Sequence, residues 1–336
     1  MARISVIGTT SWGTTLAILA ESTGADVALW ARSKGEAAVL QSEGENRRFL
    51  PNVKLSPRIN ITSSSSEAFS ESDLVLIAVP SNSMRTNIRS VKNSISHSTI
   101  VVSATKGLEI NSGKRMTQVL DEELHDIPDI HLGALSGPNL VSEIVAGKPS
   151  SSVIASPDQS VAVQVQSLLT SSSFRLYTNL DIIGVELGGA LKNIVALGAG
   201  VCDGLGIGDN SKAAFMTRGL AEITRLGVAA GADPMTFAGL AGIGDLIATC
   251  SSELSRNHHV GRELAKGKSL EQIVDTMTHV AEGVDTTRAT VKLAESLSVD
   301  MPIAQTTYNV LFNNLDIHQA IADLMDRDPV PERIEN

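Results

Sequence analysis

The chain has 336 residues, of which 42% are hydrophobic and 19% are charged, values typical of a globular protein large enough for two domains. A formal net charge of −10 and an aromatic content of 3% argue against a general nucleic-acid binder, which needs a basic face and stacking rings. The longest apolar run, from Ile194 to Cys202, is too short for a membrane span, and Gly8 interrupts the N-terminal apolar run before a signal peptide could form. Because the chain has only two cysteines and therefore no disulfide framework, the sequence predicts a cytoplasmic protein without a membrane span.

Short β-rich segments alternate with helical patterns through the first half of the chain. The predicted strands are residues 3–8, 26–30, 58–61, 73–79, 99–104, 130–135, 150–155 and 174–177. This alternation predicts an α/β fold with a doubly wound, Rossmann-like and mostly parallel sheet. Strand signals then stop, and helical patterns broken at glycines and prolines continue to the end. We therefore predict a dinucleotide-binding domain over 1–180, followed by an all-helical substrate-binding and catalytic domain over 181–336.

The segment from Gly8 to Gly13 follows the first strand and opens a helix. In that context the spacing is close to the dinucleotide fingerprint Gly-x-Gly-x-x-Gly. Gly8 is predicted to make the tight turn, and Gly13 to let the helix and strand pack closely. Thr10 stands where the fingerprint has its middle glycine, so its Cβ is expected to crowd the pyrophosphate. Gly8, Thr10, Ser11, Trp12 and Gly13 are the cofactor contacts predicted in this segment.

The second predicted strand, residues 26–30, ends without the carboxylate that usually holds the ribose of NAD. Arg32 and Ser33 follow instead. A guanidinium and a hydroxyl suit a ribose 2′-phosphate, so the sequence predicts that NADP is preferred and that NAD is also used. The alternative for Arg32 is a solvated surface cation.

Two loops follow later strands of the predicted sheet, at the edge where open α/β sheets bind their ligands. Lys106 comes directly after strand 99–104, where it can meet a cofactor or substrate, although a surface lysine is the alternative. Gly137 and Asn139 follow strand 130–135. Asn139 is expected to open a helix over 139–146, whose free N–H groups can hold an anion.

Residues 184–200 form a predicted helix of small and apolar residues that carries one cation, Lys192. A long side chain on a helix leans over the positions three and four residues before it. For Lys192 these positions are Gly189 and Gly188, so its ammonium would lie over bare backbone in a groove open to a small molecule. The alternative is a lysine that extends from a buried helix to water.

A third group of polar residues stands in the second half, beside glycine-rich turns. Arg256 can hold a phosphate through two parallel hydrogen bonds, and its neighbours Ser255 and Asn257 can add neutral donors. Asp245 has no cation close by in the sequence, so a distant lysine is its expected partner. The two histidines that follow Asn257 point apart and have no further ligand at suitable spacing, so no metal site is predicted.

Taken together, these motifs resemble the bacterial-type NAD(P)-dependent glycerol-3-phosphate dehydrogenases. The resemblance extends to about residue 314 and is carried by Gly8–Thr14, Thr105–Glu109, Ser136–Pro138, Gly184–Asn193, Asp203–Lys212, Arg218–Glu222, Gly239–Cys250 and Leu254–Asn257. The chain departs from the family pattern at Thr10, Asn139, Val141 and the pair His258-His259. The first three departures affect cofactor contacts, and none removes a catalytic group.

The resemblance implies reversible reduction of dihydroxyacetone phosphate by NAD(P)H to sn-glycerol 3-phosphate, for phospholipid synthesis, in a cleft between the domains. It implies that Lys192 is the general acid and base, that Lys106 adds a second cation at the reacting oxygen, and that Asp245 orients Lys192. The implied substrate contacts are Lys106, Gly137, Asn139, Lys192, Asn193, Asp245, Thr249, Ser255, Arg256 and Asn257. Besides the residues given above, the implied cofactor contacts are Lys106, Val141, Arg256, Val280 and Glu282.

Two other classes of protein stay open at this point. One is another two-domain dehydrogenase acting on a hydroxy acid, which would need a carboxylate site in place of Ser255–Asn257. The other is a non-catalytic NADPH-sensing protein whose cofactor site Thr10 has weakened, although the presence of Lys106, Lys192 and Asp245 argues against it. The predicted partner is a small-molecule substrate and not a nucleic acid, and a homodimer is left open.

Overall fold

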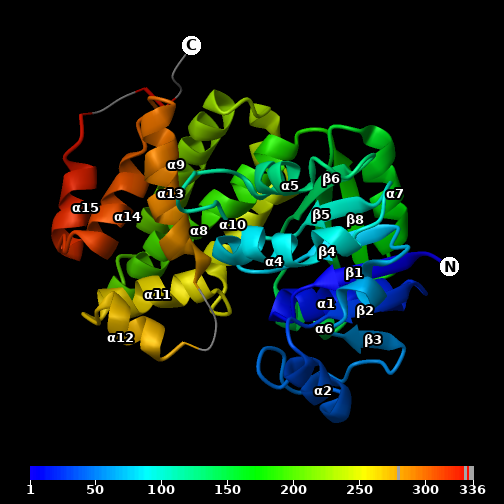
Figure 1. Ribbon diagram of the computed structural model, residues 1–336. Coiled ribbons are helices and arrows are strands. Elements are labelled where there is room, and N and C mark those ends of the chain that lie inside the picture. Colours follow the sequence, from blue (N-terminus) through cyan, green and yellow to red (C-terminus); the bar gives the residue numbers. More distant parts are fainter. Residues whose placement is uncertain (278–280, 329–330, 333–336) are drawn as a thin grey trace.

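The computed structural model describes residues 1–277, 281–328 and 331–332 (Figure 1). Its strands form one eight-stranded sheet with the order β3-β2-β1-β4-β5-β6-β7-β8. The strands are β1 Arg3–Ile7, β2 Asp26–Trp30, β3 Ile59–Thr62, β4 Leu74–Ile77, β5 Ile100–Ser103, β6 His131–Ser136, β7 Ser150–Ala155 and β8 Phe174–Asn179. All eight predicted strands are therefore confirmed, with small differences at their ends.

Both faces of the central strands are covered by helices, which explains why β4 and its neighbours are apolar on both sides. Along β4, Leu74 and Leu76 pack into the core on one face, whereas Val75 and Ile77 pack into the core on the other. Helices α1 and α7 cover the first face, and α3, α4 and α5 cover the second. The helical elements of this half are α1 Ser11–Ser22, α2 Lys34–Glu43, α3 Ser65–Phe69, η1 Ser81–Ser83, α4 Met84–Val91, η2 Lys92–Ser94, α5 Met116–Leu124, α6 Val141–Val145 and α7 Gln159–Leu169.

Neighbouring strands are parallel from β3 to β6, as the alternation of strands and helices predicts. The pair β6 and β7 is antiparallel, and β8 is again parallel to β7. The predicted Rossmann-like, mostly parallel sheet is therefore confirmed.

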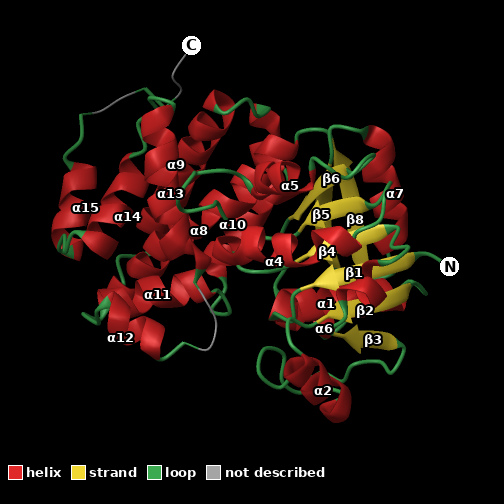
Figure 2. Cartoon of the chain, viewed as in Figure 1, coloured by secondary structure: helices red, strands yellow, loops and turns green. Residues whose placement is uncertain are grey.

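The described residues beyond β8 form only helices and turns, most of which lie beside the sheet (Figure 2), while the start of α8 and η4 pack against β6 and β7. They are α8 Ile182–Leu205, α9 Asp209–Ala229, η3 Pro234–Ala238, η4 Leu240–Gly244, α10 Asp245–Ser251, α11 Arg256–Ala265, α12 Leu270–Asp275, α13 Glu282–Ser296, α14 Pro302–Phe312 and α15 Ile317–Met325. The predicted helical second domain is thereby confirmed as an architecture. The exact boundary at residue 180 stays a prediction.

Helix α8 is the central element of the helical half. Asp181 caps its first turn by accepting a hydrogen bond from the Gly184 N–H at 2.8 Å, and Gly206 ends it in the left-handed region with φ of 64°. By length and composition alone this helix could cross a membrane, but 83% of its apolar window is buried inside the protein. Its apolar character is that of a core helix.

The helix predicted over 139–146 begins two residues later than expected. It is the five-residue α6, which starts at Val141. Asn139 stays outside because its side chain accepts a hydrogen bond from the Ser152 hydroxyl on β7, at 3.0 Å. The expectation that Asn139 opens the helix is therefore wrong, whereas the anion site at the helix start stays a prediction.

Candidate active site

Lys192 lies in the middle of α8 and is buried, with 6% of its surface exposed. Its Nζ donates hydrogen bonds to Asp245 Oδ1 and, at 2.5 Å, to the Thr249 hydroxyl. The Thr249 hydroxyl in turn donates to the same carboxylate at 3.2 Å. Lys192 therefore does not extend to water, and the distant lysine expected as the partner of Asp245 is this one.

Lys106 reaches the same carboxylate from the other half of the chain. Its Nζ donates to Asp245 Oδ2 at 2.7 Å and to the Gly137 carbonyl oxygen at 2.7 Å. An ammonium group has three N–H donors. Hydrogen bonds within the described part of the chain use two on each lysine, so one donor of Lys106 and one of Lys192 are left to meet a further oxygen.

The surroundings of Lys192 bring its pKa close to neutrality. Burial lowers the pKa of Lys192 from its usual value near 10.5 to about 8, Asp245 opposes this change, and the positive charge of Lys106 adds to it. The Lys192 ammonium is therefore mostly protonated at pH 7, and the neutral amine becomes common about one pH unit higher. This is the property required of a general acid that also serves as a base in the reverse direction.

Gly188 and Gly189 do not open a pocket beneath Lys192, contrary to the expectation from the sequence. A Cβ at Gly188 would lie 2.5 Å from the Ala241 carbonyl oxygen, and a Cβ at Gly189 would overlap the Ser136 hydroxyl. The two glycines therefore allow η4 and the end of β6 to approach the backbone of α8 closely. Because η4 is a π-helical turn that leads directly into α10, this approach brings Asp245 against Lys192.

A chain of amide hydrogen bonds joins the Lys106 segment to three helices. Asn193 on α8 donates to the Lys106 carbonyl oxygen at 3.3 Å, and its own side-chain oxygen accepts from Asn257 at 2.9 Å. Asn257 on α11 accepts in turn from the Gly283 N–H at the start of α13, at 3.0 Å. The two asparagines therefore hold the Lys106 segment, α8, α11 and α13 together. Only part of their hydrogen-bonding capacity is left for a substrate.

The predicted phosphate-binding residues lie at the start of α11. Ser255 is buried and caps the helix by accepting from the His258 N–H at 3.2 Å. Arg256 is the first residue of the helix and is exposed. Of the three consecutive residues, Arg256 is thus the one best able to reach a ligand in solution.

Glu282 opens α13 and lies close to Arg256. Burial raises the pKa of the Glu282 carboxyl above its usual range, while Arg256 and a hydrogen bond from the Ser81 backbone act in the opposite direction. Since Ser81 follows β4, this contact links the helical half to the ligand-binding edge of the sheet. Val280, also predicted to contact the cofactor, falls outside the described residues.

The turn after β1 has the shape that the fingerprint requires. Gly8 has φ of +115°, and a Cβ there would lie 2.6 Å from the Ala78 carbonyl oxygen. A Cβ at Gly13 would overlap the Gly8 carbonyl, so both predicted roles of these glycines are confirmed. Trp12 Nε1, in the same turn, is buried without a hydrogen-bond partner in the described chain. A backbone cradle at a helix N-terminus with an unused donor fits the pyrophosphate of a dinucleotide.

Thr10 has a structural function in this turn. Its hydroxyl donates to the Ala78 carbonyl oxygen at 2.8 Å and accepts from the Gly13 N–H at 3.1 Å, so that it caps α1. Ser11 is the half-buried first residue of α1. The threonine therefore supports the cradle from the side, an effect that the sequence did not predict.

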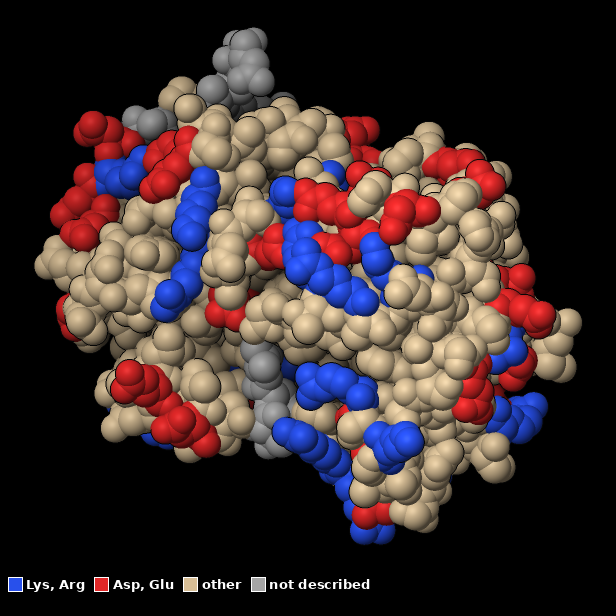
Figure 3. All heavy atoms as spheres, viewed as in Figure 1, with Lys and Arg blue, Asp and Glu red and all other residues tan. Residues whose placement is uncertain are grey.

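Arg32 and Ser33 lie directly beyond β2, as predicted. Arg32 is exposed and has no hydrogen bond or ion pair within the described ranges. Ser33 caps α2 by accepting from the Glu36 N–H at 3.2 Å. In the space-filling view, basic side chains gather over α2 and its flanking loops, in an otherwise acidic protein (Figure 3).

The remaining predicted contacts lie around the end of β6. The Gly137 carbonyl is held by Lys106, while Asn139 and Val141 are half-buried in and after the loop. The Asn139 side-chain nitrogen is buried without a partner in the described chain. Of these residues, Gly137 is the one in direct contact with Lys106.

Three residues that bear on the site were not predicted from the sequence. Asn46 holds the cofactor turn, because its side chain donates to the Thr9 carbonyl at 2.7 Å and to the Thr14 hydroxyl at 2.8 Å. The Ser136 hydroxyl is buried between Gly189 and Lys106, without a partner in the part of the chain described. Glu186, on α8, pairs with the other half of the chain. Each acts through contacts with segments far away in the sequence, so its role in the site could not be predicted from the local sequence.

The pair of adjacent histidines makes no metal centre. His258 is buried, and its Nε2 lies 2.7 Å from Asp203 Oδ2, which also pairs with Lys212. Within residues 1–277, 281–328 and 331–332, no three His, Cys, Asp or Glu side chains gather as a metal site would require.

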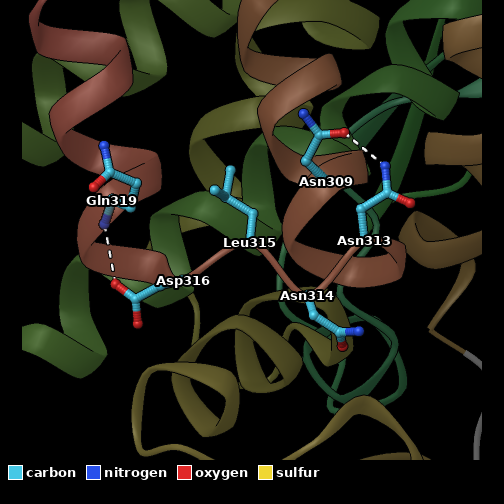
Figure 4. A pocket seen from close by; sticks show the side chains of 6 residues that line it. All are labelled: Asn309, Asn313, Asn314, Leu315, Asp316 and Gln319. Atoms are coloured by element: carbon cyan, nitrogen blue, oxygen red, sulfur yellow. Dashed lines mark hydrogen bonds between the residues drawn. The ribbon is translucent and has the colours of Figure 1, made fainter.

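A hollow of about 640 Å³ lies between α14 and α15, away from the lysine pair (Figure 4). Amide side chains line it, and Asn313 donates to Asn309 there at 3.0 Å. Asp316 caps α15 by accepting from the His318 and Gln319 N–H groups. None of the predicted site residues lines this hollow, so it is separate from the candidate active site.

Comparison with known proteins identifies relatives along almost the whole chain. Residues 3–162 match the family model of the NAD-dependent glycerol-3-phosphate dehydrogenase N-terminus, and residues 181–322 match that of the C-terminus. A glycerol-3-phosphate dehydrogenase [NAD(P)+] of Dehalococcoides mccartyi is 50% identical over 97% of this chain and 91% of the relative. One from Chlorobium limicola is 45% identical over 98% of this chain and 99% of the relative.

Solved structures agree with these relatives. Glycerol-3-phosphate dehydrogenase from Coxiella burnetii superposes with a TM-score of 0.92 at 33% identity, covering 97% of this chain and 99% of that one. The enzyme from Saccharomyces cerevisiae superposes with a TM-score of 0.81 at 26% identity, covering 97% and 99%. A ketopantoate reductase from Ralstonia eutropha, at 15% identity and a TM-score of 0.59, with 92% of this chain and 97% of that one covered, shares the fold alone.

Replacing Thr10 shows whether its side chain mainly stabilises the cofactor turn or mainly crowds the cofactor. Thr10→Gly removes both side-chain hydrogen bonds, so we expect the free energy of unfolding to fall by about 1 kcal/mol. We also expect weaker NADPH binding, because the turn becomes less ordered. Thr10→Ser keeps the hydroxyl and should behave like the wild type. Urea unfolding and a fluorescence titration with NADPH measure both effects; tighter binding by Thr10→Gly at unchanged stability would show that crowding dominates.

Proposed function

The chain belongs to the NAD-dependent glycerol-3-phosphate dehydrogenase family, and we propose that its Lys192, Lys106 and Asp245 carry out the reaction of that family. The activity is the NAD(P)-dependent interconversion of sn-glycerol 3-phosphate and dihydroxyacetone phosphate, a step that supplies phospholipid synthesis. The observation that carries the assignment of residues is the single buried carboxylate shared by two ammonium groups, each with one N–H donor left over.

In the reducing direction, negative charge develops on the ketone oxygen of the substrate. The bound dinucleotide supplies the hydride. Lys192 donates the proton through its remaining N–H, and the remaining N–H of Lys106 stabilises the same oxygen. Asp245 fixes the direction of both ammonium groups and keeps Lys192 largely protonated. In the oxidising direction the neutral form of Lys192 takes the proton from the alcohol.

The phosphate of the substrate is assigned to Arg256. Its exposed guanidinium at the start of α11 can form two parallel hydrogen bonds to phosphate oxygens. Ser255 and Asn257 support it, although both also hold structural hydrogen bonds. Gly137, Asn139, Asn193 and Thr249 complete the proposed substrate contacts. A phosphate clamp and the family match both favour a phosphorylated ketone over a hydroxy acid.

The cofactor is assigned to the turn from Gly8 to Gly13 and to the loop after β2. Arg32 and Ser33 suit the 2′-phosphate of NADP, which makes NADP the proposed preferred cofactor, with NAD also accepted. The other proposed cofactor contacts are Lys106, Val141, Arg256, Val280 and Glu282. A dinucleotide that extends from the turn at Gly8 towards Lys106 would bring its reacting end to the lysine pair.

We propose a cytoplasmic location, which agrees with the two cysteines, Cys202 and Cys250, being buried and free. We also propose a homodimer, and light scattering on the purified chain measures this assembly.

The assignment of Lys192 is tested by Lys192→Ala. We expect kcat for dihydroxyacetone phosphate reduction to fall by about 10²- to 10⁴-fold, the usual contribution of a general acid. The NADPH dissociation constant should stay within about twofold, because the residue acts on the substrate side. In the wild type, reduction should decline above pH 8 and oxidation should rise towards pH 8, since the two directions need the protonated and the neutral lysine. Full activity in Lys192→Ala would contradict the assignment; Lys92→Ala, directly after α4, is the control.

The assignment of Arg256 is tested by comparing a phosphorylated substrate with an unphosphorylated one. Arg256→Ala should raise KM for dihydroxyacetone phosphate by about 10- to 100-fold, as expected for the loss of a charged hydrogen bond. Turnover of unphosphorylated dihydroxyacetone should fall much less, because only the proposed cofactor contact of Arg256 affects it. Arg262→Ala, on the same helix, is the matched control. Equal losses with both substrates would show that Arg256 does not bind the phosphate.

The assignment of Arg32 is tested by comparing the two cofactors. Arg32→Ala should weaken NADPH binding by about 10-fold or more, because a charged contact to the 2′-phosphate is lost, and should leave NADH binding unchanged. Lys34→Ala, two residues away on α2, is the matched control. Isothermal titration of all three proteins with both cofactors gives the result, and an equal effect on NADH would indicate that Arg32 is only a surface cation.

A further inference from the structure

Glu186 is a buried carboxylate on α8 that stands six residues before Lys192 and is 8% exposed. Every hydrogen bond that its side chain makes within the described residues goes to the other half of the chain. It accepts from the Thr117 N–H at 2.8 Å and from the Thr117 hydroxyl, and it pairs with the Arg115 guanidinium. A buried carboxylate is costly unless it is fully hydrogen-bonded, and Glu186 meets this condition only across the junction between the two halves.

The partners of Glu186 mark the start of α5. Arg115 is the residue before the helix, and Thr117 lies in its first turn. The first N–H groups of a helix have no partner inside the helix, and a negative charge at that end is stabilising. Glu186 therefore caps a helix of the sheet domain from the helical domain.

The same segment carries Lys106 at its other end. Leu108 forms an antiparallel bridge with Arg115, so the chain between β5 and α5 folds back on itself. Leu108 is fully buried in the core formed around α8, and the Lys106 carbonyl is bonded to Asn193. The segment is thus attached to α8 at two places, through Asn193 near Lys106 and through Glu186 at Arg115 and Thr117.

We infer that Glu186 is a positioning residue, which holds the segment of Lys106 against α8 so that Lys106 and Lys192 share the carboxylate of Asp245. The inference rests on the proposed function of the two lysines. It assigns to Glu186 an effect on catalysis through the position of Lys106, without any contact to substrate or cofactor.

The pKa of Lys192 reports this effect. Its charged neighbours are Asp245 and Lys106, with the carboxyl of Glu282 farther off, and the Cys250 thiol beside it stays neutral because burial raises its pKa to about 12. The positive charge of Lys106 lowers the pKa of Lys192. If the segment moves away from α8, this effect weakens and the pKa of Lys192 rises.

The test compares Glu186→Gln with Glu123→Gln in the full chain. Glu123 is a matched control, since it lies at the other end of α5, is 7% exposed, and pairs with Arg85 and Arg89 on α4 instead of α8. For each protein, the pH dependence of kcat/KM for dihydroxyacetone phosphate, the melting temperature and the NADPH dissociation constant are measured. We expect Glu186→Gln to move the alkaline decline of kcat/KM upward by about half a pH unit or more. We also expect kcat to fall by about 10-fold, as for a misplaced catalytic group, with a smaller loss of NADPH affinity through the displaced Lys106.

The outcomes separate three cases. If Glu186→Gln loses stability as Glu123→Gln does but keeps the wild-type pH profile, Glu186 is only structural and the inference is overturned. If the wild type itself shows no decline near pH 8, the proposed function of Lys192 fails, whatever Glu186 does. If Glu186→Gln does not fold, Arg115→Lys takes its place, because it weakens the same contact from the other side. The inference then requires the same upward shift from Arg115→Lys, and an unchanged profile overturns it.

Discussion

The structure depends on one constraint: a buried carboxylate, Asp245, shared by two lysines that come from different halves of the chain. Neither ammonium could be buried at this position without a counter-charge, since an unpaired buried charge costs several kcal/mol. One carboxylate between two ammonium groups leaves a net positive charge. That charge has no further partner among the described side chains, so the arrangement is suited to an oxygen that becomes negative during a reaction.

This constraint explains the tight packing around α8. Asp245 can reach Lys192 only if η4 lies directly on the helix backbone, and Gly188 makes that approach possible. Lys106 can reach Asp245 only if the loop after β5 leaves the sheet and enters the helical core, where Leu108 is buried. The chain of amides from Asn193 through Asn257 to Gly283 then connects the same loop to α11 and α13.

Much of the fold and part of the candidate site could be predicted from the sequence, because the patterns that indicate them are local. The strands follow from apolar runs, the turn at Gly8 follows from the position of two glycines, and Lys192 is conspicuous as the single cation of an apolar helix. The use of Gly188 and Gly189, the hydrogen bond from Thr10 to the backbone of the sheet and the late start of α6 could not be predicted in this way. Each depends on a contact with a segment far away in the sequence: Ala241, Ala78 and Ser152 respectively. Contacts between distant segments cannot be predicted from a single sequence, and the contacts of Glu186 with Arg115 and Thr117 are of this kind.

Helix α8 fixes the distance between the contacts made by Glu186 and those made by Lys192. At a rise of about 1.5 Å per residue, Glu186 and Lys192 are about 9 Å apart along the axis of a single rigid helix. The carboxylate at one point holds the start of α5, and the ammonium at the other meets Asp245, so the helix sets the distance over which the loop of Lys106 must fold back. The bridge between Leu108 and Arg115 brings the two ends of this loop together, so that both ends lie against α8. Contacts with Asp245 and Asn193 of the helical half therefore help to position Lys106, although it follows a strand of the sheet.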